Sequence, residues 1–394
     1  MPARMHGADR LAGVATSVFS EMSRLAAEHG AVNLGQGFPD FPGPEFVKAA
    51  AIAAIRADQN QYAVSHGAPR LRRAIAAAWQ RQHGRAVDPD GEITVGSGAT
   101  ELLLDAMLGL VNPGDEVILF EPCYDSYAPD VIMAGGIPRF VRLEPPDWRF
   151  DPRALADSFT PRTRLLLVNT PHNPTGKMFT REELQLIGGL CCRHDVLVLT
   201  DEVYAEIRFE GAEHVSIATL PGMWERTLTL NSTGKTFSMT GWKIGYAVGP
   251  AALTQAVRAA HQFVTFATAT PFQEAMATAL ETAEERGYYE TLRREYTARR
   301  DGLREALESA GLPTLPMQGS YFLMADFSAL AFPDDVSFCR FLTTEIGVAA
   351  IPPSAFYAEP ATAPLLARFC FAKTPETLQA AALRLRKLQS VRRP

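Results

Sequence analysis

The chain has 394 residues, of which 47% are hydrophobic and 21% are charged. This length exceeds the roughly 250–300 residues at which one hydrophobic core stops growing, so two domains are expected, and the composition excludes a disordered protein. The net charge of -6 arises from intermixed acidic and basic residues without a basic stripe. A protein that binds nucleic acid or an anionic membrane is therefore not expected.

Five cysteines are present, and they include no Cys-x-x-Cys motif. Their odd number and their spacing fit neither a disulfide framework nor a zinc site. The N-terminal residues lack the apolar core of a signal peptide, and no segment reaches the ~18 consecutive apolar residues of a membrane span. We therefore expect a cytoplasmic protein without a metal centre.

Short apolar runs separated by helical patterns occupy the middle of the chain. They are Ile93–Val95, Val117–Phe120, Leu165–Val168, Val196–Leu199, Leu228–Leu230 and Ile244–Val248. Continuous rather than alternating hydrophobicity predicts strands covered by helices on both faces, as in parallel sheets. Thr180 and Glu183 form a capping box, which predicts a helix between two of these strands. The middle of the chain is therefore expected to be α/β.

The pattern changes in the last third of the chain. From Pro271 to about Ala310, a stretch rich in Ala, Glu, Leu and Arg predicts a long helix that bridges one domain to the next. Beyond it, strand-like Tyr321–Met324 and Arg368–Phe371 alternate with helices near Asp335–Ile346 and Pro375–Leu388, the last of them capped by Thr374. These elements predict a smaller α+β domain.

We expect three parts in the chain. Residues 41–285 form the large domain, residues 286–394 form the small C-terminal domain, and residues 1–40 form an N-terminal segment that joins the small domain.

Polar residues follow three of the predicted strands. Asn169 to Gly176 follow one, Asp201 and Tyr204 follow the next, and Lys235 lies in a small-residue loop after the third. Ligands of open α/β sheets bind beyond the carboxyl ends of the strands, so these groups are expected to meet in one crevice. A lysine amine in water has a pKa of roughly 10.4, so it needs burial or a cationic neighbour to react at neutral pH. Lys235 is predicted to be such a lysine.

A glycine-containing turn precedes these strand ends. Thr94 to Glu101 lie between a predicted strand and a predicted helix, where free amides and the positive helix end favour a phosphate. A phosphate cup, a lysine able to form a Schiff base and an acid to pair with a pyridinium nitrogen are the parts of a pyridoxal-phosphate site.

Two segments of the sequence resemble nucleotide-binding motifs, but each match is incomplete. Gly96 to Glu101 nearly match the dinucleotide fingerprint, with Glu121 at another strand end, but Glu101 replaces the third glycine. Gly234 to Thr236 end like a P-loop, but Thr229 stands where the first glycine belongs. Neither a nicotinamide-dependent dehydrogenase nor a nucleoside-triphosphatase is expected.

Six motifs, in family order, resemble the fold-type I, class I aminotransferases. They are Asn-Leu-Gly-Gln-Gly-Phe-Pro-Asp (33–40), Asn-Gln-Tyr (60–62), Asn-Thr-Pro-His-Asn-Pro-Thr-Gly (169–176), Asp-Glu-Val-Tyr (201–204), Ser-Thr-Gly-Lys-Thr-Phe (232–237) and Gly-Trp-Lys-Ile-Gly (241–245). The chain is most similar to the branch with kynurenine/glutamine and bacterial methionine aminotransferases, from about Val14 to Leu388. The resemblance implies the PLP transferase fold of type I: a mostly parallel sheet of the seven-stranded type flanked by helices, plus a smaller α+β domain.

The resemblance also implies pyridoxal 5'-phosphate (PLP) as the cofactor, with a role for individual residues. Lys235 would form the Schiff base and then move the α-proton, and Asp201 would keep the pyridinium nitrogen protonated. Tyr204 and Asn173 would hydrogen-bond the phenolic oxygen, and Tyr124 would stack on the ring.

A further set of residues is implied to hold the cofactor phosphate. The set in the same subunit is Gly98, Ala99, Thr100, Ser232 and Lys243. Lys243 stands where aspartate aminotransferases use arginine, a departure shared with the kynurenine branch. Tyr62 would reach the phosphate of the neighbouring subunit, which implies a homodimer with a shared active site.

The substrates implied by the resemblance are a small amino acid and a 2-oxo acid. Arg368 would clamp the α-carboxylate with its planar fork, assisted by Gly37 and Asn173. Phe19 lies where kynurenine-type enzymes carry an aromatic residue, and with Tyr124, Tyr127 and Phe266 it predicts an apolar or aromatic pocket.

The matching motifs contain no second arginine for a distal carboxylate. Ala267 stands near the position of a histidine in a kynurenine-type relative. We therefore expect neutral amino acids as donors, methionine-like ones before aromatic amino acids, glutamine or kynurenine.

Two other functions stay open. A carbon–sulfur β-lyase acting on cysteine conjugates or cystathionine would use the same site. A non-catalytic PLP-binding regulator would carry a DNA-binding domain ahead of the motifs, for which we expect no room before Asn33. Of the histidines, His172 is expected to pack within its loop and His66 to lie near the dimer interface.

Overall fold

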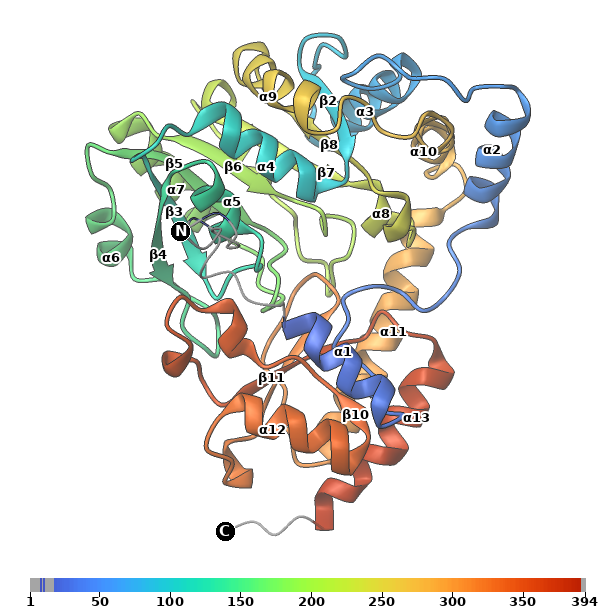
Figure 1. Ribbon diagram of the computed structural model, residues 1–394, viewed down its shortest axis with the longest axis vertical. Coiled ribbons are helices and arrows are strands. Elements are labelled where there is room, and N and C mark those ends of the chain that lie inside the picture. Colours follow the sequence, from blue (N-terminus) through green and yellow to red (C-terminus); the bar gives the residue numbers. More distant parts are fainter. Residues whose placement is uncertain (1–7, 9, 11–17, 391–394) are drawn as a thin grey trace, which may run out of the picture.

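A computed structural model describes Ala8, Arg10 and residues 18–390 of the chain. In Figure 1 the upper part is built around a large sheet and the lower part around short strands, and α11 (Tyr288–Ser309) runs from one part to the other. Within the described range, no helix has the length and hydropathy needed to cross a membrane.

The upper part contains a seven-stranded sheet in the order β2-β8-β7-β6-β5-β3-β4. All neighbouring pairs are parallel except those of β8, which runs antiparallel to both β2 and β7. The strands are β2 (Ile93–Ser97), β3 (Glu116–Glu121), β4 (Ile137–Arg142), β5 (Thr163–Asn169), β6 (Leu197–Asp201), β7 (Thr227–Ser232) and β8 (Ile244–Val248). The predicted mostly parallel α/β architecture is confirmed.

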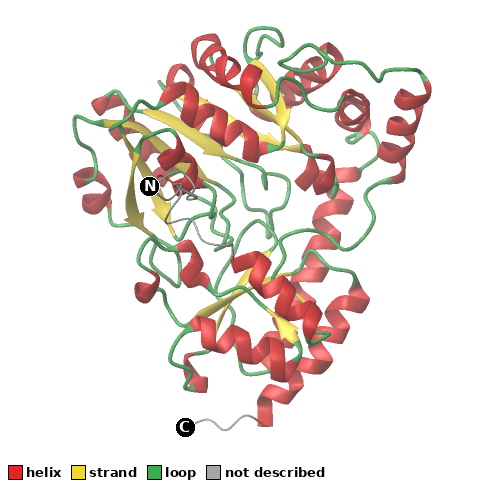
Figure 2. Cartoon of the chain, viewed as in Figure 1, coloured by secondary structure: helices red, strands yellow, loops and turns green. Residues whose placement is uncertain are grey.

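Helices cover both faces of this sheet (Figure 2). The helices of the upper part are α2 (Glu45–Arg56), α3 (Pro69–His83), α4 (Ala99–Leu110), α5 (Tyr127–Met133), α6 (Pro152–Asp157), α7 (Arg181–His194), α9 (Ala251–Val264) and α10 (Thr270–Thr282), with the short α8 (Thr233–Thr236) at the end of β7. Alternate residues of a strand point to opposite faces, and on β5 Leu165 packs in the cluster that includes α4, whereas Leu166 packs in the cluster that includes α7. Burial on both faces explains the continuous apolar runs.

The predicted capping box is present at the start of α7. The Thr180 side chain accepts from the Glu183 amide, and the Glu183 carboxylate accepts from the Thr180 amide. Strand β4 was not predicted, because it is an edge strand whose sequence mixes Pro and Arg with apolar residues and which is mostly half-exposed.

The single long helix expected over residues 271–310 is wrong. The structure has α10 and α11 instead, separated by a turn at which Gly287 adopts a φ of +62°. Glycine adopts this left-handed conformation without steric cost, so the chain turns there although the surrounding residues favour a helix.

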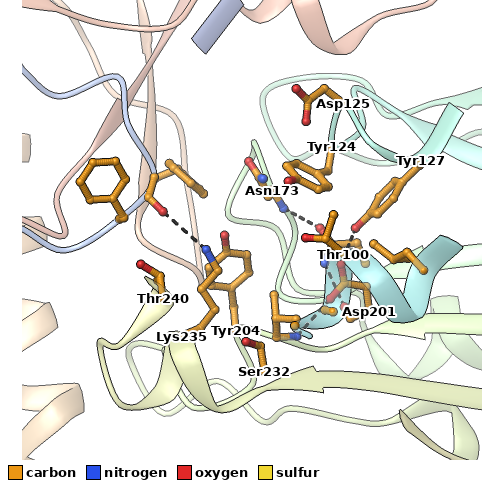
Figure 3. A pocket seen from close by; sticks show the side chains of 18 of the residues that line it. Thr100, Tyr124, Asp125, Tyr127, Asn173, Asp201, Tyr204, Ser232, Lys235 and Thr240 are labelled. Atoms are coloured by element: carbon orange, nitrogen blue, oxygen red, sulfur yellow. Dashed lines mark hydrogen bonds between the residues drawn. The ribbon is translucent and has the colours of Figure 1, made fainter. Parts of the chain in front are cut away.

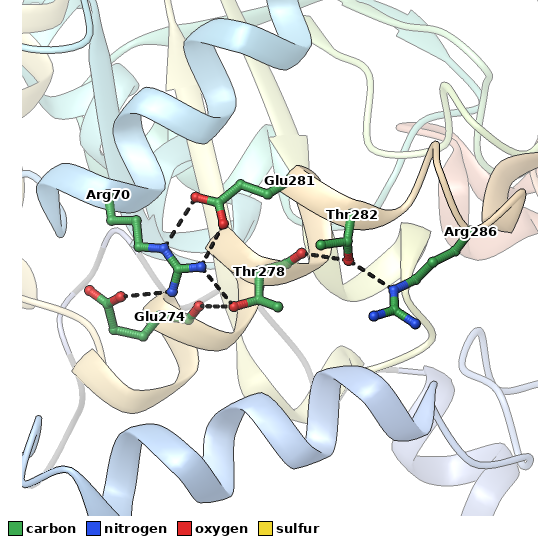
Figure 4. Close-up of polar contacts among 6 residues, drawn as sticks. All are labelled: Arg70, Glu274, Thr278, Glu281, Thr282 and Arg286. Atoms are coloured by element: carbon green, nitrogen blue, oxygen red, sulfur yellow. Dashed lines mark hydrogen bonds and ion pairs between the residues drawn. The ribbon is translucent and has the colours of Figure 1, made fainter.

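Helix α3 is tied to α10 by Arg70 (Figure 4). Its guanidinium donates to Glu281 at 3.1 Å, to Glu274 at 3.4 Å and to the Thr278 hydroxyl at 3.0 Å. Ala68, immediately before α3, donates its amide hydrogen to the Gln273 side chain of α10 at 2.7 Å. These contacts fix the end of the segment 57–68, which carries Tyr62.

The lower part has two small sheets. Strand β1 (Val32–Asn33) pairs with β10 (Val348–Ala349) in parallel, and β9 (Phe322–Asp326) pairs with β11 (Leu366–Cys370) in antiparallel. The helices are α1 (Val18–Glu28), α12 (Asp335–Phe341), which continues as a π-helical turn to Ile346, and α13 (Pro375–Leu385). As predicted, Thr374 caps α13, its side chain accepting from the Thr377 amide.

The pairing of β1 with β10 ties the N-terminal segment to the lower part. We therefore propose to keep the domain boundaries at residues 40 and 285, the second of which falls in the turn between α10 and α11. Residues 1–7, 9 and 11–17 of the N-terminal segment lie outside the described residues.

Candidate active site

A cavity of about 420 Å³ lies where the carboxyl ends of the central strands meet the lower part. Its size is that of a small-molecule site. The residues predicted for the site that line it are Phe19, Gly37, Gly98, Ala99, Thr100, Tyr124, Tyr127, Asn173, Asp201, Tyr204, Ser232, Lys235, Lys243 and Arg368. Figure 3 shows Lys235, Tyr204 and Asp201 on one side of the cavity and Tyr124 and Asp125 on the other.

Lys235 is presented by the short helix α8, directly after β7 ends. Its ammonium donates to the Tyr321 hydroxyl at 2.9 Å and lies 3.5 Å from the Gly37 carbonyl (Figure 3 marks this second contact). Burial lowers the pKa of Lys235 to about 8, although the nearby Asp201 opposes the change. The neutral, nucleophilic amine is therefore accessible near neutral pH.

Asp201 is the last residue of β6 and is buried beneath the cavity. One carboxylate oxygen accepts from the Tyr127 hydroxyl at 2.7 Å, and the other accepts from the Val203 amide at 3.2 Å (Figure 3). Burial raises the pKa of Asp201 to about 6, and these two hydrogen bonds limit the rise. Above that pH the cavity holds a buried carboxylate, which favours a cationic partner.

Arg368 reaches the cavity from β11 in the lower part. Its guanidinium donates to the Asn173 side chain at 2.8 Å and to the Gly35 carbonyl at 3.0 Å. Its Nε has no hydrogen-bond partner, and it forms no ion pair with any residue of the described range. Burial lowers the pKa of Arg368 to about 10, so it stays cationic at neutral pH. A buried, unpaired guanidinium favours an anionic ligand.

Aromatic rings surround this guanidinium. The ring centres of Phe322, Phe356 and Phe19 lie 4.0, 5.0 and 5.1 Å from the Arg368 Cζ. Such packing keeps the guanidinium in place and leaves an apolar wall beside it.

A second anion site lies at the start of α4. Gly98 has a φ of +80° and precedes the helix without capping it through a side chain, so the first amides of α4 face the cavity. The Lys243 ammonium lies 3.4 Å from the Thr100 hydroxyl. A Cβ built on Gly98 would lie 3.1 Å from the same Lys243 nitrogen, so the ammonium lies close to the Gly98 backbone. Free amides, a helix N-terminus and an ammonium together suit a phosphate.

Tyr62 and Phe266 lie outside this cavity. Tyr62 is 82% exposed and packs edge-on against Phe266, which is itself 46% exposed, with ring centres 5.3 Å apart. Phe266 follows α9 and does not line this cavity, so its part in an apolar pocket stays a prediction. The contact of Tyr62 with a neighbouring subunit stays a prediction.

The structure adds to the site residues that have no such role in the sequence pattern. The Tyr321 hydroxyl accepts a hydrogen bond from Lys235, although the sequence around Tyr321 predicts only a buried strand. Tyr127, expected as a wall of the pocket, also donates a hydrogen bond to the Asp201 carboxylate. Other cavity residues, to which the sequence assigns no individual role, are Gln36, Phe38, Leu103, Asp125, Asn169, Val203, Thr240 and Phe322. Gln36, Phe38, Asn169 and Val203 belong to the family motifs, whereas the other four lie outside them and have no local signal of a site. His172 packs within its loop as expected, its Nδ1 lying 2.7 Å from the Thr175 hydroxyl.

The cavity thus offers four groups in one place: a half-buried amine, a buried carboxylate, a phosphate cup and a guanidinium without an ion-pair partner among the described residues. These groups fit a cofactor that has an aldehyde, a protonated ring nitrogen and a phosphate, beside a substrate carboxylate. The family described as "Aminotransferase class I and II" matches residues 29–385. The chain belongs to this family. Aminotransferases of the family use pyridoxal 5'-phosphate, and the chain is a PLP-dependent amino acid aminotransferase.

Curated relatives cover nearly the whole of this aminotransferase. It is 44% identical to a methionine aminotransferase of Escherichia coli (strain K12) over 379 residues, covering 96% of this chain and 97% of the relative. It is 41% identical to kynurenine–oxoglutarate transaminase 1 of Homo sapiens over 411 residues, covering 96% of this chain and 97% of that protein.

Solved structures agree with these relatives. The N-succinyldiaminopimelate aminotransferase of Mycobacterium tuberculosis superposes with a TM-score of 0.94 at 46% identity, covering 97% of this chain and 100% of that chain. These similarities support amino-group transfer and do not favour the carbon–sulfur lyase alternative.

Proposed function

We propose that this aminotransferase takes the amino group of neutral, apolar amino acids, methionine-like ones above others, and passes it to a 2-oxo acid. The observation that carries the proposal is the half-buried Lys235 amine in one cavity with the Asp201 carboxylate and an Arg368 guanidinium that has no ion-pair partner among the described residues. The methionine aminotransferase of Escherichia coli, 44% identical, supports this choice of donor.

We assign the following roles to the residues around the cofactor. PLP, when bound, supplies an electron sink for the bond broken at the α-carbon. Lys235 would hold the cofactor covalently and, as a free amine, would move the proton of the α-carbon, a role for which its lowered pKa suits it. Asp201 would keep the ring nitrogen protonated, Tyr204 and Asn173 would donate to the phenolic oxygen, and Tyr124 would stack on the ring.

The phosphate and the substrate carboxylate use the two anion sites. Gly98, Ala99, Thr100, Ser232 and Lys243 hold the phosphate at the start of α4. At the opposite end, Arg368 binds the α-carboxylate, with Asn173 and Gly37 beside it.

The composition of the cavity wall supports a neutral donor. Its cations within the described residues are Lys235, Lys243 and Arg368, and each already has a role. A side-chain carboxylate of the substrate would find no further cation, and it would meet Asp125 in the same wall. Aromatic residues, among them Phe19 and Phe322, instead offer apolar surface to a thioether or a ring.

We further propose a homodimer in which the active site is shared. Phe263 is 85% exposed and Tyr62 is 82% exposed, and Val64, Val264 and Phe266 are exposed as well. Large apolar side chains exposed together indicate a surface that another protein covers. A second copy placed there would bring Tyr62 towards the phosphate of its neighbour.

We propose a cytoplasmic location. All five cysteines are free, and four of them are buried, which suits a reducing compartment.

The test is a comparison of two reactions with the purified, PLP-saturated enzyme. L-Methionine with a neutral 2-oxo acid is expected to give the 2-oxo acid of methionine at a rate that depends on the acceptor. A cysteine conjugate without acceptor is expected to release little pyruvate, thiol or ammonia. Fast release without acceptor, together with no transfer from methionine, would refute the proposal. Lys235→Ala should abolish transfer, whereas Lys48→Ala, at a surface lysine paired with Glu45, serves as the matched control.

A further inference from the structure

A buried cluster of three titratable side chains lies behind the phosphate cup. Glu101 and Asp105 extend from α4, and His261 extends from α9. His261 Nδ1 lies 2.6 Å from the Glu101 carboxylate and 3.5 Å from the Asp105 carboxylate. His261 Nε2 lies 2.7 Å from the Ser65 carbonyl. None of these side chains lines the cavity, and none has a role in the reaction described above.

The contacts of His261 define its protonation state. A carbonyl oxygen only accepts, so Nε2 carries a hydrogen. A carboxylate also only accepts, so Nδ1 carries a second hydrogen, and the ring is an imidazolium. Burial lowers the pKa of His261, but the neighbouring carboxylates of Asp105 and Glu101 outweigh burial and raise the pKa well above its usual range.

Asp105 depends on this imidazolium. The side chain is fully buried, and neither carboxylate oxygen has a hydrogen-bond partner among the described residues. The imidazolium at 3.5 Å is the nearest opposite charge that the structure places beside it. Without that charge, two carboxylates would lie buried on one side of α4.

The cluster also contacts the two segments that lead to phosphate sites. Glu101 accepts a hydrogen bond from the Ser97 amide, directly before Gly98 in the phosphate cup. The Ser65 carbonyl, which accepts from His261, lies three residues after Tyr62, the residue proposed to reach the neighbouring phosphate. Uncompensated negative charge in the first turns of α4 would repel a phosphate bound at the start of that helix.

We propose that His261 is a positioning residue for the cofactor phosphate, offsetting part of the negative charge of Glu101 and Asp105 behind the cup and holding the Ser97 turn and the Ser65 segment together. This inference rests on the proposed function, in which the start of α4 binds the PLP phosphate. It assigns His261 no contact with the cofactor.

The test compares PLP with pyridoxal, which lacks the phosphate, as ligands of the cofactor-free protein. His261→Asn is expected to raise the Kd of PLP at least about tenfold and to change the Kd of pyridoxal less than about twofold. The double variant His261→Asn with Asp105→Asn removes one positive and one negative charge, and it should regain about fivefold or more of the lost PLP affinity.

Four results would overturn the proposal. Equal weakening of PLP and pyridoxal would show a general packing defect, and unchanged binding of both would show no role. A double variant no better than the single one would remove the charge argument. The fourth result concerns a metal ion, which the cluster could bind because ligand atoms of its three side chains lie within 4.8 Å of one another. Loss of PLP affinity on EDTA treatment of the wild type, reversed by zinc or magnesium, would assign the cluster to a metal.

Thermal unfolding of each cofactor-free variant serves as the folding control. If His261→Asn does not fold, the PLP affinity of the double variant alone tests the proposal. It should bind PLP within about fivefold of the wild type, and a larger loss overturns the proposal. A wild type that binds neither PLP nor pyridoxal would instead refute the proposed function, so the two failures are distinguishable.

Discussion

Replacing Asp201 by Asn is expected to stabilise the cofactor-free protein while it destroys activity. Asp201 is buried, and its carboxylate has hydrogen bonds from Tyr127 and Val203 but no ion pair with the described residues. The cofactor-free protein therefore bears the cost of a buried charge that serves only the bound cofactor. Asn keeps the size of the side chain and one acceptor oxygen, and it removes the charge.

The size of the effect follows from the pKa of Asp201. Burial raises this pKa from 3.8 to about 6, a difference of about 2, which corresponds to about 3 kcal/mol of unfolding free energy. A raised carboxyl pKa means that the folded state binds the proton more tightly than the unfolded state. The cost is therefore fully present well above pH 6, falls to about half near pH 5 and is small near pH 4.

The assay is thermal unfolding of the cofactor-free wild type and Asp201→Asn at pH 8 and pH 5, at equal protein concentration. For a chain of this length, about 3 kcal/mol corresponds to a rise of about 3 °C in Tm, so the variant should gain that much at pH 8 and about half at pH 5. With PLP added, the variant's kcat/KM for L-methionine should fall at least about a hundredfold.

The control is Asp157→Asn, the same substitution at an exposed residue at the end of α6. A gain for Asp201→Asn that grows as the pH falls, or a loss of stability equal at both pH values, would refute the account of Asp201.

Three further outcomes are expected. Arg368→Lys should lower kcat/KM for L-methionine about a hundredfold, because the planar two-point contact with the α-carboxylate is lost. The Kd of PLP should change little, and a larger effect on PLP binding than on kcat/KM for methionine would contradict the role of Arg368. The rate at which the cofactor-free protein captures PLP should rise with pH and level off above about 8, as neutral Lys235 forms, and a rate independent of pH from 6 to 9 would contradict the lowered pKa. Tyr62→Phe should weaken PLP binding several-fold, and dilution that dissociates the dimer should remove the difference between the variant and the wild type.

The sequence was sufficient for the sheet because its strands are buried on both faces. The runs around Leu166 and Val198 read as continuous apolar segments and lie at the centre of the sheet. The sequence does not predict strand β4, because this strand lies at the edge of the sheet and lacks a continuous apolar run. It does not predict the break between α10 and α11 either, because helix propensity does not show where a single residue such as Gly287 turns the chain.

In the site, the sequence predicts the residues at the ends of the predicted strands. It does not predict the residues that hold them in place. Lys235 and Asp201 follow strands whose ends must meet, so position in the sequence was enough. Tyr321 and His261 come from distant segments whose local patterns read as core, and only tertiary packing brings them to Lys235 and Glu101. For Phe266, which lies outside the cavity, the sequence shows only a large aromatic residue and not the surface that it faces.

The central claim is that Lys235 holds PLP in this cavity and works there as the reactive amine. The most direct test is to incubate the protein with PLP, reduce it with borohydride and locate the modified residue by peptide mass spectrometry. The account predicts one PLP per chain, attached to Lys235, and loss of the label when excess L-methionine is added before the reduction. A label on another lysine, or no label in PLP-saturated wild type, would contradict it.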